Sequence, residues 1–397
     1  MSFRRMLIAV LTMIVATGVL GVGGSVAGAA SDKVVKIGVL APLNAGLVEF
    51  GTGIRNSVQL AVDQANTRHA IPGWTIELVA VNDSSDPATG AAGAATLVAD
   101  PAVIGVVGTY NSGVAAQALP VLAPAHLALV SPGNTLASLT LGADASNPTR
   151  PNDNYFRMVA SDAEQAPFLA RSARKLGIRD VAVVSETKAV SKGLADAFAK
   201  AFTDGGGKVA VQKVVLDGAT DFKDFLDAAL PKKPDAIFFG GEYQVASTLR
   251  VQATERGFKK PLIGGDGIKD DAFITGAGPS SKGTLASTVG VPADRLASAK
   301  AFLKAYKKAG FAERATDFGP YAYDAANLII AAGKRVLAGK DAIPADARAQ
   351  VVAAVQKSRV KGATGPLGFD AFGDTKNRVF TLYRVQGHKL AWVPITP

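Results

Sequence analysis

The sequence predicts an α/β protein with two lobes. Short apolar runs alternate with amphipathic helical patterns along most of the chain, which is typical of parallel strands connected by helices. A first alternating series ends near residue 140, and a second begins after a polar stretch at 141–154. With 397 residues, 48% of them apolar, the chain is long enough to build two hydrophobic cores.

The first series contains four expected strands, each followed by a helical segment. The strands are expected at 34–40, 75–81, 104–108 and 127–130. The first helix follows a loop at 41–53 and places Ile54, Val58 and Ala61 on one apolar face. Two further helices, and an extended segment that crosses to the second series, are expected at 88–99, 114–122 and 155–159.

The second series alternates in the same way and then continues as helices without strands. Its expected strands are 181–185, 209–215, 236–239 and 261–264, and its expected helices are 162–176, 193–204, 221–230 and 244–256. After a crossing segment at 284–289, late helices are expected at 294–309, 320–337 and 345–357, and a C-terminal hairpin at 379–385 and 390–393. Because the late helices have no strands of their own, they must pack on an existing sheet, which implies lobes made of non-contiguous segments.

The N-terminus has the pattern of a secretory signal. Arg4 and Arg5 precede an apolar run at 6–20, and small residues lead to an Ala-Gly-Ala site at 27–29. Because the run is short for a membrane span, we expect residues 1–29 to be a cleaved signal peptide and the mature chain to be periplasmic or extracellular. The chain has no cysteine, which excludes disulfides, thiolate metal sites and a lipoprotein anchored through cysteine.

The chain is basic, with a formal net charge of +10 at pH 7, but the basic residues are scattered. They form nothing longer than pairs such as Lys232 and Lys233, and aromatic residues make up only 7% of the chain. A nucleic-acid-binding surface would need a clustered basic stripe with aromatic platforms. We therefore expect no nucleic-acid partner, and the positive charge favours an anionic cell envelope or a membrane partner.

The sequence lacks the motifs of the common enzyme classes. The three histidines, His69, His126 and His388, are dispersed and have no metal-ligand spacing. No Walker loop or G-x-S-x-G elbow occurs, and the glycines at 205–207 follow a helix, where they indicate a helix stop. We expect neither metal nor cofactor, and a secreted enzyme is only a remote alternative.

Polar residues gather at the carboxyl ends of two expected strands. The strand at 104–108 leads to Asn111 and Ser112 at the start of a helix, and the strand at 127–130 leads to a loop ending at Thr135. Open parallel sheets bind ligands at such ends, and a helix start attracts anions. We expect Ser112 and Thr135 to lie close together and to face a small anion, although helix capping and an ordinary turn explain the same residues.

Taken together, this arrangement resembles the type I periplasmic binding proteins, in particular the branched-chain amino-acid-binding group that serves ABC importers. The resemblance covers residues 36–392 and rests on short runs in a fixed order. They are IGVLAPL at 37–43, IGVVG at 104–108, NSG at 111–113, SP at 131–132 with Thr135, GG at 240–241, GGDG at 264–267 and TGPLGFD at 364–370.

The resemblance implies two Rossmann-like lobes joined by three crossings, with a ligand closed between them. It assigns residues 33–158 and 289–375 to an N-terminal lobe, and residues 159–288 and 376–397 to a C-terminal lobe. It also implies a monomeric receptor that delivers a small amino acid to a membrane ABC permease. Receptors for amides, urea or aromatic acids with the same fold are the alternatives.

The resemblance also assigns roles to residues of the first lobe. The ligand carboxylate would bind at Ser112 or Asn111 and at the loop of Gly133, Asn134 and Thr135. These residues supply the hydroxyls and main-chain amides that the family uses for that group.

Further residues are implied at the cover and the far side of the cleft. Asp266 would pair with the ligand ammonium group, Phe50 would cover the ligand, and Asp162 lies near the first crossing. Val190 and Glu242 stand at two positions where the family often has aromatic residues. These two departures put the size and charge of the substrate in doubt, since Glu242 is suited to a basic or amide group.

Overall fold

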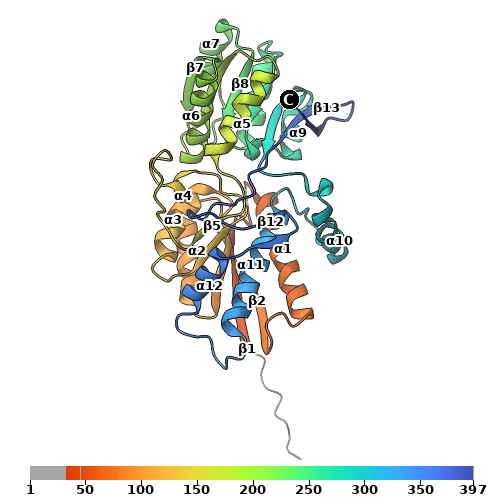
Figure 1. Cartoon of the computed structure of the whole chain (residues 1–397). Coiled ribbons are helices and arrows are strands. Elements are labelled where there is room, and N and C mark those ends of the chain that lie inside the picture. The colour runs from red at the N-terminus through yellow and green to blue at the C-terminus, as the bar shows by residue number, and fades with distance from the viewer. Residues whose placement is uncertain (1–32, 45, 397) are drawn as a thin grey trace, which may run out of the picture. The chain divides into compact units, whose positions relative to one another are not determined.

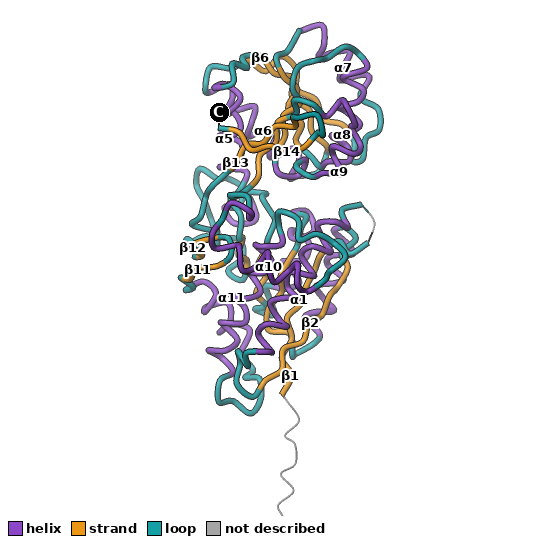
Figure 2. Tube along the Cα trace, turned by 90° about the vertical axis from the view of Figure 1, so that its right-hand side faces the viewer, coloured by secondary structure: helices purple, strands orange, loops and turns teal. Residues whose placement is uncertain are grey.

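A computed structural model describes residues 33–44 and 46–396 of the chain (Figure 1). The predicted signal peptide at 1–29 lies outside these residues. Within the described part, helices are too short or too polar to span a membrane. Two separate sheets carry the fold, and each is enclosed by helices, as the sequence predicted (Figure 2).

The first sheet consists of five parallel strands in the order β2-β1-β3-β4-β5. Their bounds are β1 Lys33–Ala41, β2 Trp74–Asn82, β3 Val103–Gly108, β4 Ala128–Ser131 and β5 Tyr155–Arg157. Every residue of β3 and β4 is buried, which explains why both segments are continuous apolar runs. The extended segment predicted at 155–159 therefore begins as the edge strand β5.

Helices from two distant parts of the chain cover the first sheet. They are α1 Val48–Thr67, α2 Pro87–Ala99, α3 Ser112–Leu122, α4 Ser138–Leu141, α10 Lys300–Ala309, α11 Gly319–Leu337 and α12 Ala347–Gln356. Helix α11 packs against α1 and β3, and α12 packs against β3 and β4. The expectation that the late helices pack on an existing sheet is confirmed for α11 and α12, whereas α10 packs against α1.

The sequence placed the start of α1 too late. The helix begins at Val48, so Phe50 lies in its first turn rather than in a loop. Gly51 and Gly53 were interpreted as loop residues, but both lie inside the helix. A Cβ atom on Gly51 would come 1.8 Å from the carbonyl oxygen of Pro42, so glycine is needed there for close packing.

The second sheet has seven strands in the order β14-β13-β10-β9-β8-β6-β7. Their bounds are β6 Asp180–Glu186, β7 Lys208–Val215, β8 Ala236–Gly240, β9 Leu262–Gly264, β10 Leu285–Thr288, β13 Thr381–Gln386 and β14 Ala391–Ile395. Strands β6 to β10 are parallel, whereas β13 and β14 form the predicted antiparallel hairpin beside β10. The segment predicted only as a crossing at 284–289 is thus largely a strand of this sheet.

The helices of the second lobe follow its strands in sequence. They are α5 Asp162–Lys175, α6 Ala189–Asp204, α7 Lys223–Ala229, α8 Tyr243–Glu255 and α9 Asp271–Ala277. Helix α6 begins at Ala189, four residues before the predicted start at Gly193. A Cβ atom on Gly193 would touch only Leu136, at 3.5 Å, so this glycine neither starts nor breaks the helix.

Short elements complete the described chain. They are the 3-10 helices η1 Leu230–Lys232, η2 Asp266–Ile268, η3 Gly278–Ser281, η4 Ala293–Arg295 and η5 Ala297–Ala299, and the paired strands β11 Val360–Gly362 and β12 Gly365–Leu367. The helix predicted at 294–309 is therefore divided, because only residues 300–309 are α-helical.

Three segments cross between the lobes, as the resemblance implied. The first follows β5, the second follows β10, and the third leads from β12 to β13. A buried ion pair of 2.7 Å between Arg157 Nε and Asp374 Oδ1 joins the first crossing to the third. The bounds given above for the two lobes stay a prediction.

Candidate functional site

Two loops of the first lobe meet beside the start of α3. The hydroxyl oxygen of Ser112 accepts hydrogen bonds from the main-chain amides of Thr135 (3.2 Å) and Leu136 (3.3 Å). This contact confirms that the ends of β3 and β4 bring Ser112 and Thr135 together. Asn111 precedes the helix but makes no side-chain cap, so helix capping does not account for that residue.

Buried polar side chains hold the loop that contains Thr135 in place. The Asn134 amide donates to the carbonyl oxygens of Thr109 (3.0 Å) and Tyr110 (2.8 Å). Ser131 Oγ accepts from the amides of Gly133 and Asn134. Asn134 is 0% exposed, so it organises the two loops instead of facing a ligand.

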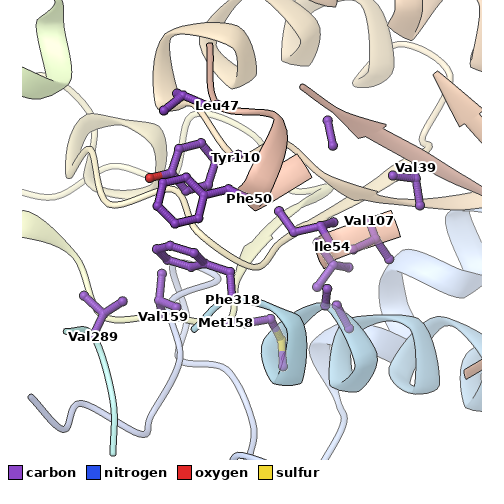
Figure 3. Close-up of a cluster of buried hydrophobic side chains, with 14 of the residues drawn as sticks. Val39, Leu47, Phe50, Ile54, Val107, Tyr110, Met158, Val159, Val289 and Phe318 are labelled. Carbon is purple, nitrogen blue, oxygen red and sulfur yellow. The ribbon is translucent and has the colours of Figure 1, made fainter. Parts of the chain in front are cut away.

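Aromatic rings pack behind these loops (Figure 3). Phe50 stacks on Tyr110 with ring centroids 4.6 Å apart, and Phe318 packs edge-on against both rings. Phe50 is 1% exposed and is a buried member of this cluster, so its ring is part of the core in the described arrangement. A Cβ atom on Gly133 would come 3.2 Å from Tyr110, which explains why the loop has glycine beside the ring.

The opposite wall carries two buried carboxyl groups joined by one amide. Gln165 Nε2 donates to Asp162 Oδ1 (3.1 Å) and to Asp266 Oδ1 (2.9 Å). Gln165 Oε1 in turn accepts from the Asp266 amide (3.0 Å) and from the Ser287 hydroxyl (2.7 Å). The glutamine therefore sets the position of both acids.

Burial changes the charge of this acid pair. It raises the pKa of Asp266 to about 6. Burial, together with the neighbouring Asp266 carboxylate, raises the pKa of Asp162 to about 8. At neutral pH the pair thus holds one negative charge, on Asp266, while Asp162 is mostly protonated.

Glu242 connects the two lobes. Its Oε1 accepts from the side-chain amide of Asn111 at 2.7 Å, and its Oε2 is 2.9 Å from Lys188 Nζ. Lys188 also lies 3.7 Å from Glu186, a carboxylate whose pKa burial raises. Both oxygens of Glu242 therefore have protein partners, and its charge is balanced by Lys188.

These groups line a polar pocket between the loops and the opposite wall, which is open to solvent and has an empty volume of about 440 Å³. Seven predicted site residues line it: Asn111, Ser112, Gly133, Thr135, Val190, Glu242 and Asp266. Three others do not: Phe50, Asn134 and Asp162. A second, mostly apolar pocket of about 470 Å³ shares Asp266 and includes Val291, Leu296, Phe318 and Tyr321.

The chain matches the model of a known protein family. The family model described as "Periplasmic binding protein" matches residues 34–389. The chain belongs to the periplasmic binding protein family. Membership of this family implies export from the cytoplasm, and the fold is the type I periplasmic binding protein fold.

Individual members of the periplasmic binding protein family resemble the chain along nearly its whole length. The Leu/Ile/Val-binding protein BraC3 of Rhizobium johnstonii is 28% identical over 358 residues, covering 90% of this chain and 93% of that protein. A second similar protein is the branched-chain amino acid transporter substrate-binding protein LivJ from Streptococcus pneumoniae, whose structure was solved in complex with isoleucine. It is 28% identical to this chain and superposes with a TM-score of 0.77. The match covers 92% of this chain and 100% of LivJ. These relatives are solute-binding proteins rather than enzymes.

A solved structure at lower identity supports the same fold. The leucine-binding protein LivK of Thermotoga maritima is 24% identical and superposes with a TM-score of 0.80, covering 91% of this chain and 99% of that one.

Sequence reasoning missed five residues that line the polar pocket: Tyr110, Ser191, Leu194, Gly241 and Gly267. The late helix start at residue 193 hid Ser191, which lies in the first turn of α6. With the correct start, Val190 and Leu194 are four residues apart and share a helix face. Gly241 and Gly267 adjoin predicted residues, and a Cβ atom on Gly267 would come 2.8 Å from the Gly241 carbonyl oxygen.

Proposed function

We propose that this periplasmic binding protein is the receptor of an ABC importer and captures a small amino acid between its lobes. One observation carries the proposal: hydroxyl and amide groups at Ser112 and Thr135 face the same pocket as the buried carboxylate of Asp266. An α-amino acid presents the complementary charges, a carboxylate and an ammonium group, at fixed separation. The names of the relatives, which include Leu/Ile/Val-binding proteins, support the same ligand class.

The ligand carboxylate would bind the first lobe. The oxygen of Ser112 already accepts two main-chain amides, which leaves its proton to be donated into the pocket. Ser112 also begins α3, an 11-residue helix whose N-terminal amides favour an anion. Thr135 adds a hydroxyl from the second loop.

The ligand ammonium group would bind Asp266. A buried carboxylate is costly without a cation, as its raised pKa of about 6 reflects. An ammonium group beside it would offset that cost and favour the ionised form. The protonated Asp162 adds no competing charge, so one cation satisfies the pair.

Ligand binding to both walls would favour the closed arrangement of the lobes. Other contacts already join the lobes at the rim of the cleft. Lys269 Nζ lies 2.8 Å from Asp317, and the Tyr243 hydroxyl donates to the carbonyl oxygen of Gly46 at 3.1 Å. The ligand would add the interactions that make closure stable, and the closed receptor would then dock on its permease. This role involves no chemical step.

The proposed route to the cell exterior is a signal peptide at 1–29. Cleavage there, with no cysteine in the chain, would release a soluble monomer with a formal net charge two units below the +10 of the full chain. Mass spectrometry of the exported protein tests this point directly, because the expected N-terminus is residue 30.

A ligand screen tests the function. We would measure the thermal shift of the mature protein with the common amino acids, with small amides and urea, and with aromatic acids. Stabilisation by amino acids alone supports the proposal, whereas a response only to amides or aromatic acids assigns the receptor to another ligand class. Asp266→Asn should lower amino-acid affinity by about 30-fold or more, because it removes the charge that faces the ammonium group.

A matched control tests whether the loss of any carboxylate, and not specifically that of Asp266, lowers the affinity. Asp204→Asn removes an exposed carboxylate of α6 whose ion-pair partner among the described residues is Lys200 on the same helix. This control should bind amino acids like the wild type. Equal affinity of Asp266→Asn and the wild type would contradict the ammonium role.

A further inference from the structure

Ser191, a residue of the polar pocket's wall, carries a buried hydroxyl that has no partner among the described residues. It lies in the first turn of α6 and is 2% exposed. Its Oγ has no hydrogen-bond partner among the described residues, although the residue lines the pocket. A buried hydroxyl without a partner is unfavourable, so this position is explained best by a group that a ligand supplies.

Asn111 presents a second unused atom, on the first-lobe side of the same pocket. Its amide nitrogen donates to Glu242 Oε1 at 2.7 Å, and only the nitrogen end of the amide can donate to a carboxylate. The orientation of the side chain is thereby determined, and the carbonyl oxygen Oδ1 is the remaining atom. That oxygen is buried and likewise unpartnered within the described chain.

The charged groups nearby exclude a charged ligand group at this place. Lys188 already pairs with the other carboxylate oxygen of Glu242. A cationic group of the ligand would therefore meet a carboxylate that already has a partner, and the lysine would repel it. An anion would face the carboxylate of Glu242 and the carbonyl oxygen of Asn111. Among the described residues that line the pocket, the buried side-chain atoms without a partner are one acceptor, Asn111 Oδ1, and one hydroxyl, Ser191 Oγ, which can both donate and accept.

We propose that Ser191 and Asn111 form a subsite for a neutral hydrogen-bonding side chain, so that the receptor prefers an amide- or hydroxyl-bearing amino acid over its apolar isostere. A ligand N–H or O–H would donate to Asn111 Oδ1, and the ligand oxygen would accept from or donate to Ser191. An apolar side chain of the same shape would leave both protein atoms buried and unpaired. Sites of this kind discriminate strongly against the analogue that lacks the polar group. The inference rests on the proposed amino-acid-binding function.

Two isosteric ligand pairs test the subsite. Calorimetric titration of the mature protein would compare asparagine with leucine, and threonine with valine, because each pair differs in polarity far more than in shape. We expect the polar member of at least one pair to bind about tenfold more tightly or better. Equal or tighter binding of both apolar members would overturn the subsite and leave the proposed function intact. Binding of none of the 20 common amino acids would instead overturn the proposed function.

The variant Ser191→Ala tests the residue itself. Because the hydroxyl has no partner in the described part of the chain, its removal should leave folding intact and the melting temperature unchanged or higher. We expect the affinity ratio of polar to apolar ligand to fall about tenfold, with apolar binding unchanged or improved. An unchanged ratio would overturn the role of Ser191.

Thr203→Val is the matched control on the same helix. The Thr203 hydroxyl donates only to the carbonyl oxygen of Ala199 within α6, at 2.9 Å, and does not line the pocket. Its removal should leave the affinity ratio as in the wild type. A change in ratio equal to that of Ser191→Ala would show a general effect of the helix and overturn the assignment.

Discussion

The two walls of the polar pocket are built in different ways. On the first-lobe wall the polar groups of Ser131 and Asn134 are used within the protein, and they hold the loop of Thr135 in place. On the second-lobe wall, burial raises the pKa of Asp266 to about 6, and Ser191 Oγ has no partner in the described chain. The difference indicates that the protein's own hydrogen bonds organise the first-lobe loop, whereas Asp266 and Ser191 on the second wall have groups left for a ligand. On the first wall Asn111 Oδ1 is the exception, because it is also unpartnered among the described residues.

Arg157 connects the first-lobe wall of the pocket to the segments that cross between the lobes. Its Nη1 donates to the carbonyl oxygens of Asn134 (3.3 Å) and Leu136 (2.9 Å), which flank Thr135. Its Nε pairs with Asp374, in the segment leading to the third crossing. One buried guanidinium group thus holds the carboxylate loop and two crossings together.

The largest expected effect comes from breaking this connection. Arg157→Met should destabilise the protein by about 3–5 kcal/mol, because it leaves Asp374 buried without its cation. Urea unfolding followed by circular dichroism measures the change. Lys200→Met, which removes an exposed lysine paired with the exposed Asp204 on the same helix, is the control and should cost at most about 1 kcal/mol. A loss as small as that of the control would show that the pair does not hold the wall.

The second-largest expected effect is a loss of affinity in Ser112→Ala. It distinguishes the two walls by whether the loss depends on the side chain of the amino acid. Ser112→Ala should weaken every amino acid by a similar factor, about 10- to 100-fold, since it removes a hydrogen bond to the shared carboxylate. Titration of the variant with several amino acids measures the factor. A loss confined to one side-chain class would contradict the assignment of the first wall to the common group.

A pH series tests the charge on the second wall. Ammonium binding needs ionised Asp266, so amino-acid affinity should fall up to about tenfold per pH unit below its pKa of about 6. Stability without ligand should change in the opposite direction. The folded pKa values of Asp266 and Asp162 lie above the ordinary value of 3.8, so the folded state binds protons more tightly and these groups favour it increasingly as pH falls from about 8 to about 4.

The difference between the wild type and Asp266→Asn isolates this contribution from other acids. In calorimetric titrations the pH dependence of affinity below pH 6 should disappear in the variant. Persistence of the full dependence would assign the titration to another group.

The smallest expected effect concerns the ion pair of Lys269 and Asp317 at the rim of the cleft, outside both walls of the pocket. Lys269→Ala removes the pair with Asp317, whose side chain is 40% exposed while that of Lys269 is 15% exposed, and should weaken ligand binding about fivefold or less. The effect should shrink further at high salt, because exposed charges are screened. A loss comparable to that of Ser112→Ala would mean that closure depends on the rim instead of the ligand.

Much of the first wall could be predicted from the sequence. Parallel strands end at one edge of a sheet, so the polar residues after 104–108 and 127–130 had to meet, and the contact of Ser112 with Thr135 follows from that rule. The helix starts at Val48 and Ala189 could not be predicted in the same way. Gly51 suggested a loop, and only the close approach of Pro42 explains why glycine stands inside this helix.

By itself, the sequence determined the α/β class, the order of the elements and the polar ends of two strands, because periodicity and turn residues are local properties. Only the tertiary structure decided that Phe50 is core, that Gln165 joins two acids, and that Glu242 is saturated by Asn111 and Lys188. Gln165 and Asp266 are 101 positions apart and Lys188 and Glu242 are 54 apart, while Asn111 and Glu242, 131 apart, come from different lobes. Such contacts depend on how distant segments pack together, which local patterns do not encode.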